Sequence, residues 1–295
     1  YHPINYVAEQ NCPWPHIKKL MEHIFGEQVE LGYDYMQLLY RNPMQILPIL
    51  CLVSQERGTG KTTFLDLIRE IYGNNAIIVG NSEITSEFNA LVSGKLVVGV
   101  DETSLEDNTK VTERLKMMST AKKVPMQRKG KDHEEIENFT KYVLCSNNET
   151  RVIYTQEDEI RFWVRKVEPI PKEENIPDIL PVSSQEIPGF LSFLLSRQMH
   201  IREAQSRMWF KPEDIETEAL LKLKAAQQPL PVREMKETIR TLFMDFPAEE
   251  YIISIKVLKL MVDEIQRIPS DIIRGYLKTN LGVTTALDEN GIAKT

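Results

Sequence analysis

Hydrophobic residues follow a helical period in the first part of the chain. They recur every three or four positions, which is typical of helices that bury one face. This spacing predicts two helices, over Trp14–Phe25 and Glu27–Tyr40, with Gly26 between them and Asn42-Pro43 at the end. A unit of about 40 residues is too small to form a core alone, so we expect it to dock on the adjoining part of the chain or on a neighbouring subunit.

The middle of the chain alternates between short apolar runs and segments of helical period. Runs rich in β-branched residues predict buried strands, and their alternation with helices indicates a parallel sheet covered on both faces. The expected strands are Ile46–Val53, Ala76–Val79, Lys95–Val100, Tyr142–Cys145 and Phe162–Val167, and the expected helices are Thr62–Tyr72, Ile84–Leu91 and Thr109–Thr120.

The last part of the chain is mostly helical in pattern, with a proline-containing linker at Gln228–Pro231. Three helices, a strand-like segment and a turn indicate a winged-helix-like unit that stops before its second wing strand. We therefore expect an α/β protein in four parts: 1–45 helical, 46–170 the α/β core, 171–229 a helical extension and 230–295 winged-helix-like. The expected elements are Pro188–Arg197, Pro212–Leu223, Val232–Phe243, Ile255–Glu264, Ser270–Thr279 and the strand Val283–Leu287, before a turn at Glu289–Gly291.

Composition narrows the class of protein. Hydrophobic residues make up 42% and charged residues 27% of the 295 residues, which is ordinary for a globular chain. The longest apolar run, Ile46–Val53, is too short to span a membrane. The first residues are neither an initiator Met nor a signal peptide, so we expect a piece of a longer chain. Three cysteines without zinc-ligand spacing, Cys12, Cys51 and Cys145, favour a reducing, cytoplasmic setting.

Charge is unevenly distributed. The net charge of −7 argues against general attraction to nucleic acid, but the stretch from Lys110 to Lys131 holds eight basic residues and one acidic residue, a local charge of +7. Such a stretch is either a solvated face or a phosphate-binding surface.

A phosphate-binding loop is the strongest motif. Gly58–Thr63 reads Gly-Thr-Gly-Lys-Thr-Thr, after a strand and at the start of a helix. That context aims backbone N–H groups and the helix dipole at an anion. Lys61 is expected to reach the β- and γ-phosphates and the Thr62 hydroxyl to bind Mg²⁺. The motif's usual first glycine is Gln55 here, which leaves the start of the loop open.

Two further strands end in polar residues. Asp101 and Glu102 follow one strand, where Asp101 is expected to hold Mg²⁺ and Glu102 to polarise the attacking water as general base. Asn147 follows another strand and is the candidate to orient that water, with Asn148 as its alternative. Because parallel strands end at one edge of a sheet, we expect these groups to meet near the phosphate-binding loop.

An arginine that a neighbouring subunit delivers to the phosphates would stabilise the charge of the transition state. Arg161 is the candidate for this role and Arg165 is its rival.

In the order of these motifs the chain resembles the superfamily 3 helicases, a branch of the AAA+ P-loop ATPases of viruses, phages and plasmids. It looks most like the helicase half of phage- and plasmid-type primase-helicase proteins. The resemblance covers residues 47–170 and is carried by Gly58–Thr62, Val100–Glu102, Gln127–Lys131, Ser146–Asn148 and Arg161–Trp163.

The resemblance implies a hexameric ring that hydrolyses ATP with Mg²⁺ at subunit interfaces and moves along single-stranded DNA during replication. It places a β-hairpin between the acidic and asparagine motifs, with arms at Val124–Arg128 and Glu135–Phe139. Arg128, Lys129 and Lys131 would then contact the DNA backbone in the central pore. Residues 1–45 would be a helical collar, and a primase domain or primase partner would accompany this part.

Other functions fit some of these features. A P-loop kinase or GTPase would share the phosphate-binding loop. A loader ATPase that remodels another helicase, or an assembly module that uses ATP only to hold a ring together, would share most of the site. DNA stimulation of hydrolysis separates these alternatives from a helicase.

Overall fold

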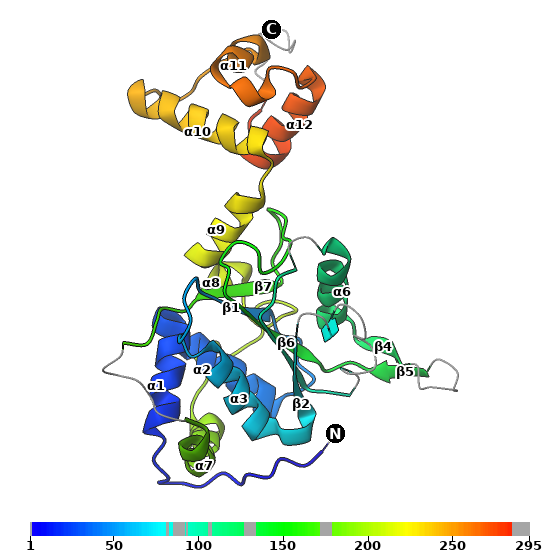
Figure 1. The fold of residues 1–295 in the computed structure, drawn as a ribbon, viewed down its shortest axis with the longest axis vertical. Helices are drawn as coiled ribbons and strands as arrows, with labels where there is room; N and C mark the ends of the chain where they lie inside the picture. Colours follow the sequence, from blue (N-terminus) through cyan, green and yellow to red (C-terminus); the bar gives the residue numbers. More distant parts are fainter. Residues whose placement is uncertain are drawn as a thin grey trace. The chain divides into compact units, whose positions relative to one another are not determined.

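The computed structural model describes residues 2–80, 83, 84, 92, 94–105, 108–126, 134–171 and 179–284. The chain divides into two compact units, residues 1–223 and 224–295. The first unit is built on a five-stranded sheet in which all pairings are parallel, in the order β2-β3-β6-β1-β7 (Figure 1). Its strands are β1 (Ile49–Val53), β2 (Ala76–Gly80), β3 (Val97–Asp101), β6 (Lys141–Ser146) and β7 (Phe162–Lys166). The predicted α/β class and parallel sheet are confirmed.

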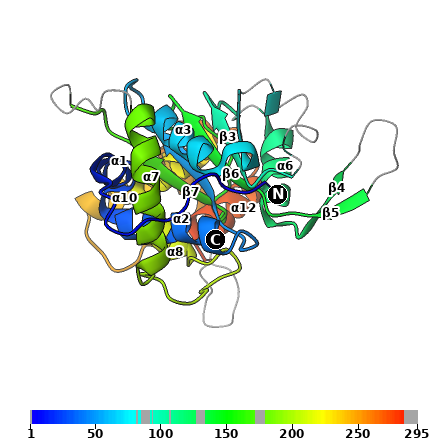
Figure 2. The same ribbon diagram turned by 90° about the horizontal axis from the view of Figure 1, so that it is seen from below.

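Helices cover both faces of this sheet, which gives three layers (Figures 1 and 2). Alternate residues of each strand enter separate cores, as the two-residue period of a strand requires. In β1, Leu50 and Leu52 face the core shared with α1, α2, α3 and α7, whereas Cys51 and Val53 face the core shared with α6 and α9. The helices of this unit are α1 (Pro15–Phe25), α2 (Val29–Arg41), α3 (Lys61–Tyr72), α6 (Thr109–Thr120), α7 (Ile179–Ser196), α8 (Pro212–Ile215) and α9 (Glu218–Gln227, which crosses the unit boundary), with 3₁₀ turns at Gly26–Gln28 and Gly73–Asn75.

The predicted N-terminal helices form and dock on the sheet, as their size required. They share one core with α3 and α7, so residues 1–45 have no separate core of their own. Helix α7 also completes the start of α1, because the buried carboxylate of Glu186 accepts the backbone N–H groups of His16 and Ile17, both at 3.0 Å.

Several predicted boundaries are wrong, for reasons that side chains explain. The first strand begins at Ile49 rather than Ile46, since Pro48 has no N–H for the sheet. Helix α7 begins at Ile179 and carries Pro188 inside it, whereas the sequence predicted a start at that proline. The helix predicted over Pro212–Leu223 is two helices, α8 and α9. The break falls at Thr217, because its hydroxyl donates to Val164 O and accepts the N–H of Leu220 in the first turn of α9.

A buried ion network joins α2 to α7. Asp34 is fully buried and accepts bonds from Arg197 (2.5 Å) and from the backbone N–H groups of His200 (3.0 Å) and Ile201 (2.7 Å). The Arg197 side chain is 7% exposed and lies over the rings of Tyr33 and Phe193. The carboxylate therefore fixes the turn that follows α7 as well as the packing of the two helices.

Helix α7 approaches the N-terminal segment closely at Gly189. A Cβ added there would lie 2.0 Å from the carbonyl oxygen of Cys12, nearer than any real side chain comes. We predict that Gly189→Ala lowers the free energy of unfolding by about 1–3 kcal/mol, because backbone must move to admit the methyl group. Urea unfolding would measure this, and Ser196→Ala at the exposed end of the same helix should leave stability nearly unchanged.

A two-stranded antiparallel hairpin extends beyond the sheet in both views (Figures 1 and 2). Strand β4 (Lys123–Met126) pairs with β5 (Glu134–Glu137), with Val124 opposite Ile136. The predicted hairpin is confirmed over these residues, and 127–133 lie outside the described residues. Asn138 holds the base of the hairpin to α6 by donating to the carbonyls of Met118 (2.5 Å) and Ala121 (2.9 Å).

The second unit is helical in its described part. Its small core contains six residues: Val232, Met235, Leu258, Val262, Ile265 and Ile273. The three helices predicted from sequence are present, and the strand predicted over Val283–Leu287 lies outside the described residues from Thr285 onward, with no strand at 283–284. The helices are α10 (Leu230–Asp245), α11 (Ile255–Met261) and α12 (Ser270–Leu281), with a 3₁₀ turn at Asp263–Ile265.

The helix predicted over Ile84–Leu91 lies mostly outside the described residues. Within the described part of the chain, none of the helices combines the length and the apolar character needed to cross a membrane.

Candidate functional site

The predicted phosphate-binding loop, Gly58–Thr63, lies at the carboxyl edge of the sheet, between β1 and the first turn of α3. Gly58 (φ 71°) and Gly60 (φ 80°) adopt left-handed backbone that other residues rarely take, which explains both glycines. Two contacts from outside the loop hold it: Ile170 N donates to Gly58 O (3.3 Å), and His23 Nε2 lies 3.2 Å from Thr59 O. Helix α3 begins at Lys61, so its first N–H groups face the loop.

Lys61 is buried inside this loop although it is a lysine. Its ammonium donates to the hydroxyls of Ser54 and, at 3.0 Å, Thr59, and the residue is only 6% exposed. Burial lowers the pKa of Lys61, while nearby Asp101 acts in the opposite direction. Among the described residues, Lys61 has two hydroxyl partners and no bonded carboxylate, so its buried cation is suited to an incoming anion.

Thr62 and Asp101 meet across the site, as the sequence predicted. The Thr62 hydroxyl donates to Asp101 Oδ2 at 3.2 Å, and Asp101 is the last residue of β3. Thr63 follows on the first turn of α3 and is half-buried. The pair places a carboxylate and a hydroxyl oxygen beside the phosphate-binding loop.

Glu102 has a strained backbone. Its φ of 54° lies in the left-handed region, which is uncommon for a residue with a side chain. Its N–H donates to Asp101 Oδ1 at 3.0 Å, and its side chain is exposed. The next residue stays against the neighbouring strand, because Thr103 N donates to Cys145 O of β6 at 2.7 Å. The two consecutive carboxylates, Asp101 and Glu102, therefore lie at the edge of the sheet beside the end of β6.

Asn147 and Asn148 follow β6, which lies between β3 and β1 in the sheet. The carbonyl oxygen of the Asn148 side chain accepts the N–H (2.9 Å) and the hydroxyl (3.2 Å) of Thr150, so it is engaged in its own loop. Asn147 is exposed at the end of the strand. Both asparagines thus follow the strand that lies between β3, which carries the acidic residues, and β1, which precedes the predicted phosphate-binding loop.

The two candidate arginines have different surroundings. Arg165 lies inside β7, is 8% exposed, and bonds Gln28 Oε1 at 3.1 Å and Glu27 Oε1 at 3.3 Å. Arg161 precedes β7, and its side chain is 34% exposed. Its carbonyl accepts the N–H of Ile49, the first residue of β1, so Arg161 lies at the amino edge of the sheet. A five-residue strand is about 16 Å long, so Arg161 is far from its own phosphate-binding loop.

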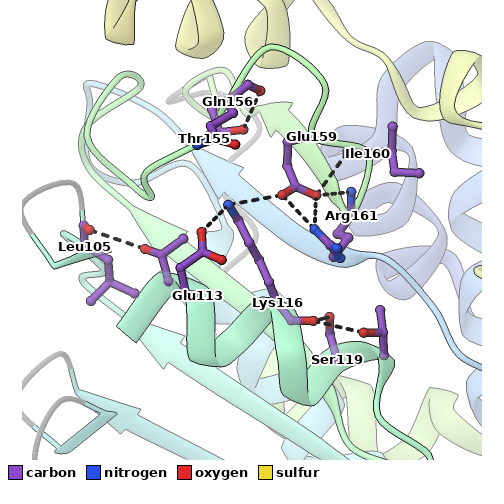
Figure 3. A network of polar contacts seen from close by, with 11 residues as sticks. Leu105, Glu113, Lys116, Ser119, Thr155, Gln156, Glu159, Ile160 and Arg161 are labelled. Carbon is purple, nitrogen blue, oxygen red and sulfur yellow. Dashed lines mark hydrogen bonds and ion pairs between the residues drawn. The ribbon is translucent and has the colours of Figure 1, made fainter. Parts of the chain in front are cut away.

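Arg161 belongs to a polar network that the sequence did not reveal (Figure 3). Glu159 bonds its guanidinium at 2.9 and 3.0 Å, and Lys116 of α6 bonds the same carboxylate at 3.1 Å. Burial alone would raise the pKa of Glu159, and the bonds from Arg161 and Lys116 outweigh it, so the pKa is lowered. The only sequence signal was that two acidic residues, Asp158 and Glu159, stand shortly before Arg161, a pattern that a surface loop also shows.

The predicted DNA-contacting residues Arg128, Lys129 and Lys131 lie outside the described residues. One of the basic residues between Lys110 and Lys131, Lys116, is buried in an ion network. Its charge is therefore not available to a binding surface.

A family model matches the part of the chain that carries most of these residues. Residues 52–165 match a family model described as a family of unknown function (DUF5906). The matched range runs from β1 to Arg165 and includes the acidic, asparagine and arginine residues of the site.

The chain is also similar to a replication protein. It is 30% identical over 166 residues to the DNA primase-polymerase of Nitratiruptor phage NrS-1, which is 54% of this chain and 23% of that protein. The chain thus spans less than a quarter of this relative's length. Two apo structures of the NrS-1 C-terminal region share the fold, with TM-scores of 0.71 and 0.68 at 16% and 17% identity. They cover 98% and 99% of this chain, and the chain covers 76% and 73% of them.

Proposed function

We propose that this protein is a Mg²⁺-dependent ATP hydrolase that drives a DNA helicase in phage DNA replication. The observation that carries the proposal is the meeting of buried Lys61, Thr62 and Asp101 at one sheet edge, with Thr62 Oγ1 and Asp101 Oδ2 3.2 Å apart. A nucleoside-triphosphate site combines these four features: a glycine-containing loop, the N-terminus of a helix, a buried lysine and an acidic residue at the end of a strand.

The residues present fit Mg²⁺ and a triphosphate. Neighbouring oxygen ligands of octahedral Mg²⁺ are about 3 Å apart, close to the separation of the Thr62 and Asp101 oxygens. Proteins commonly hold this ion with one or two carboxylates and leave the remaining positions to phosphates and water. When bound, Mg²⁺ neutralises charge on the phosphate oxygens, and Thr62 and Asp101 are the residues that would hold it.

The chain's own residues have separate roles in hydrolysis. Lys61 binds the β- and γ-phosphates, since its buried ammonium already faces the loop. Glu102 takes the proton of the attacking water, and Asn147 orients that water from the neighbouring strand end. Arg161 acts on the nucleotide of an adjacent subunit, because it is at the opposite edge from its own loop while Arg165 is buried.

Similarity to a phage DNA primase-polymerase supports replication as the setting. The hairpin β4–β5, which extends from α6, supports a contact with single-stranded DNA inside a hexameric ring. Lys129 and Lys131, which lie between β4 and β5 in the sequence, would bind the DNA backbone with an affinity that falls as salt is added. A primase domain or partner would supply primers.

ATP hydrolysis with and without single-stranded DNA tests the proposal. We predict that DNA stimulates turnover, and that Lys129→Ala/Lys131→Ala removes the stimulation but leaves the DNA-independent rate within about twofold. The double variant Arg202→Ala/Arg207→Ala, which removes two exposed cations elsewhere in the first unit, should keep the stimulation. Hydrolysis that DNA does not affect would contradict a helicase and favour a loader ATPase, which shares the catalytic residues.

A further inference from the structure

Glu159 holds both the backbone and the side chain of Arg161. Its Oε1 accepts the N–H groups of Ile160 (3.0 Å) and Arg161 (2.9 Å), which fixes the turn before β7. The same carboxylate accepts two bonds from Arg161 Nη1, at 3.0 Å to Oε1 and 2.9 Å to Oε2. One side chain therefore sets the direction in which the arginine leaves the fold (Figure 3).

The carboxylate is itself anchored from a different element. Lys116 on α6 is 3.1 Å from Glu159 Oε2, and the two side chains are 6% and 4% exposed. The ammonium also bonds Glu113 at 2.8 Å and lies 5.9 Å from the centre of the Phe162 ring. The lysine and the carboxylate form a buried ion pair, whereas Arg161, whose side chain is 34% exposed, is its more exposed third member.

This difference in burial allows Arg161 to leave without exposing an unpaired charge. A buried carboxylate that loses its last cation is strongly destabilised. Here Lys116 remains on Glu159 when the guanidinium turns toward a phosphate, so the carboxylate keeps a partner in both states. An isolated Glu159–Arg161 pair would instead retain the arginine.

We propose that Glu159, anchored by Lys116, is the positioning residue that presents Arg161 to the nucleotide of the adjacent subunit. The proposal rests on the proposed function, because it gives Arg161 its target. It assigns no contact with the nucleotide to Glu159 or Lys116; both act through the arginine.

Mixing of variant subunits tests this assignment. A Lys61→Ala subunit lacks a working phosphate-binding loop but keeps its arginine, and an Arg161→Ala subunit has the reverse defect. We expect each alone to lose at least 10-fold in kcat, and a mixture to regain activity at interfaces that combine an intact loop with an intact arginine. We expect Glu159→Gln to lose at least 10-fold in kcat, to bind ATP within about threefold of the unmodified protein, and to regain activity when mixed with Lys61→Ala.

The double variant Lys116→Met/Glu159→Gln removes both buried charges and should behave like Glu159→Gln, which keeps the test usable if the single variant does not fold. Glu237→Gln, in the exposed pair with Arg240, is the control and should hydrolyse ATP at the unmodified rate.

The outcomes distinguish a failure of this proposal from a failure of the proposed function on which it rests. If Arg161→Ala is rescued by Lys61→Ala but Glu159→Gln and the double variant are fully active, Glu159 does not position the arginine. The proposal is likewise overturned if the folded Glu159 variants lose activity and mixing does not restore it. If Arg161→Ala itself keeps full activity, the arginine's role between subunits is wrong, and the proposal fails with it.

Discussion

Replacing Glu102 with Gln should lower kcat for ATP hydrolysis by about 10²- to 10⁴-fold while ATP still binds. The amide keeps the size of the side chain but cannot take a proton from water. Lys61, Thr62 and Asp101 remain, and these residues make the proposed contacts with the phosphates and Mg²⁺. Steady-state hydrolysis gives kcat, and a fluorescent ATP analogue gives Kd, which should change by less than about threefold.

Glu203→Gln is the matched control, because Glu203 is an exposed carboxylate of the same unit with no assigned role. It should leave both quantities unchanged. Near-normal hydrolysis by Glu102→Gln would mean that another group is the base. A large loss of ATP binding would instead mean that the left-handed turn at residue 102 shapes the binding site itself.

Asp34→Ala should lower the free energy of unfolding of the first unit by about 3–5 kcal/mol. The substitution removes the shortest ion pair of the buried Arg197 guanidinium. The ion pair that remains is with Glu30, whose side chain is 56% exposed. It also leaves the N–H groups of His200 and Ile201 without their acceptor. Both losses occur in a buried site, where water cannot replace the missing oxygens.

Tryptophan fluorescence during urea unfolding measures this effect in the correct unit, because all three tryptophans, Trp14, Trp163 and Trp209, precede residue 224. Asp66→Ala removes a partly exposed carboxylate that pairs with Arg69, and it should cost less than about 1 kcal/mol. Equal effects of the two substitutions would show that the Asp34 network contributes no more than a surface ion pair.

Much of the fold was predictable because burial leaves a periodic pattern. The five strands and α6 were found from continuous apolar runs and a helical period, with errors of a few residues at their ends. The larger errors came from contacts distant in sequence. Nothing near Thr217 indicates that its hydroxyl bonds Val164 across the fold and divides a helix. The order of the strands in the sheet could not be predicted from the hydrophobic pattern either, because it depends on which strands, distant in sequence, pair with each other.

The candidate site was predictable where its residues are neighbours in sequence or end a strand. Lys61, Thr62 and Asp101 were identified from a motif and from the rule that parallel strands end at one edge. The sequence named Arg161 as the candidate arginine and Arg165 as its rival, but it did not reveal that Arg165 is buried and Arg161 is partly exposed. Ser54 and Glu159 were also missed, since an ordinary serine and glutamate acquire their roles only through the partners that the fold brings to them.

The sheet order also bears on how this chain folds. Strand β1 lies between β6 and β7, so both of its neighbours are strands that begin at Lys141 and Phe162. Such distant pairings must overcome the entropy of closing long loops, which slows folding. During synthesis β1 emerges before both of its partner strands and has no partner until about a hundred more residues have left the ribosome. Through that interval it is an apolar segment with both edges open, so we expect folding to be slow and chaperone binding to concentrate on residues 49–53.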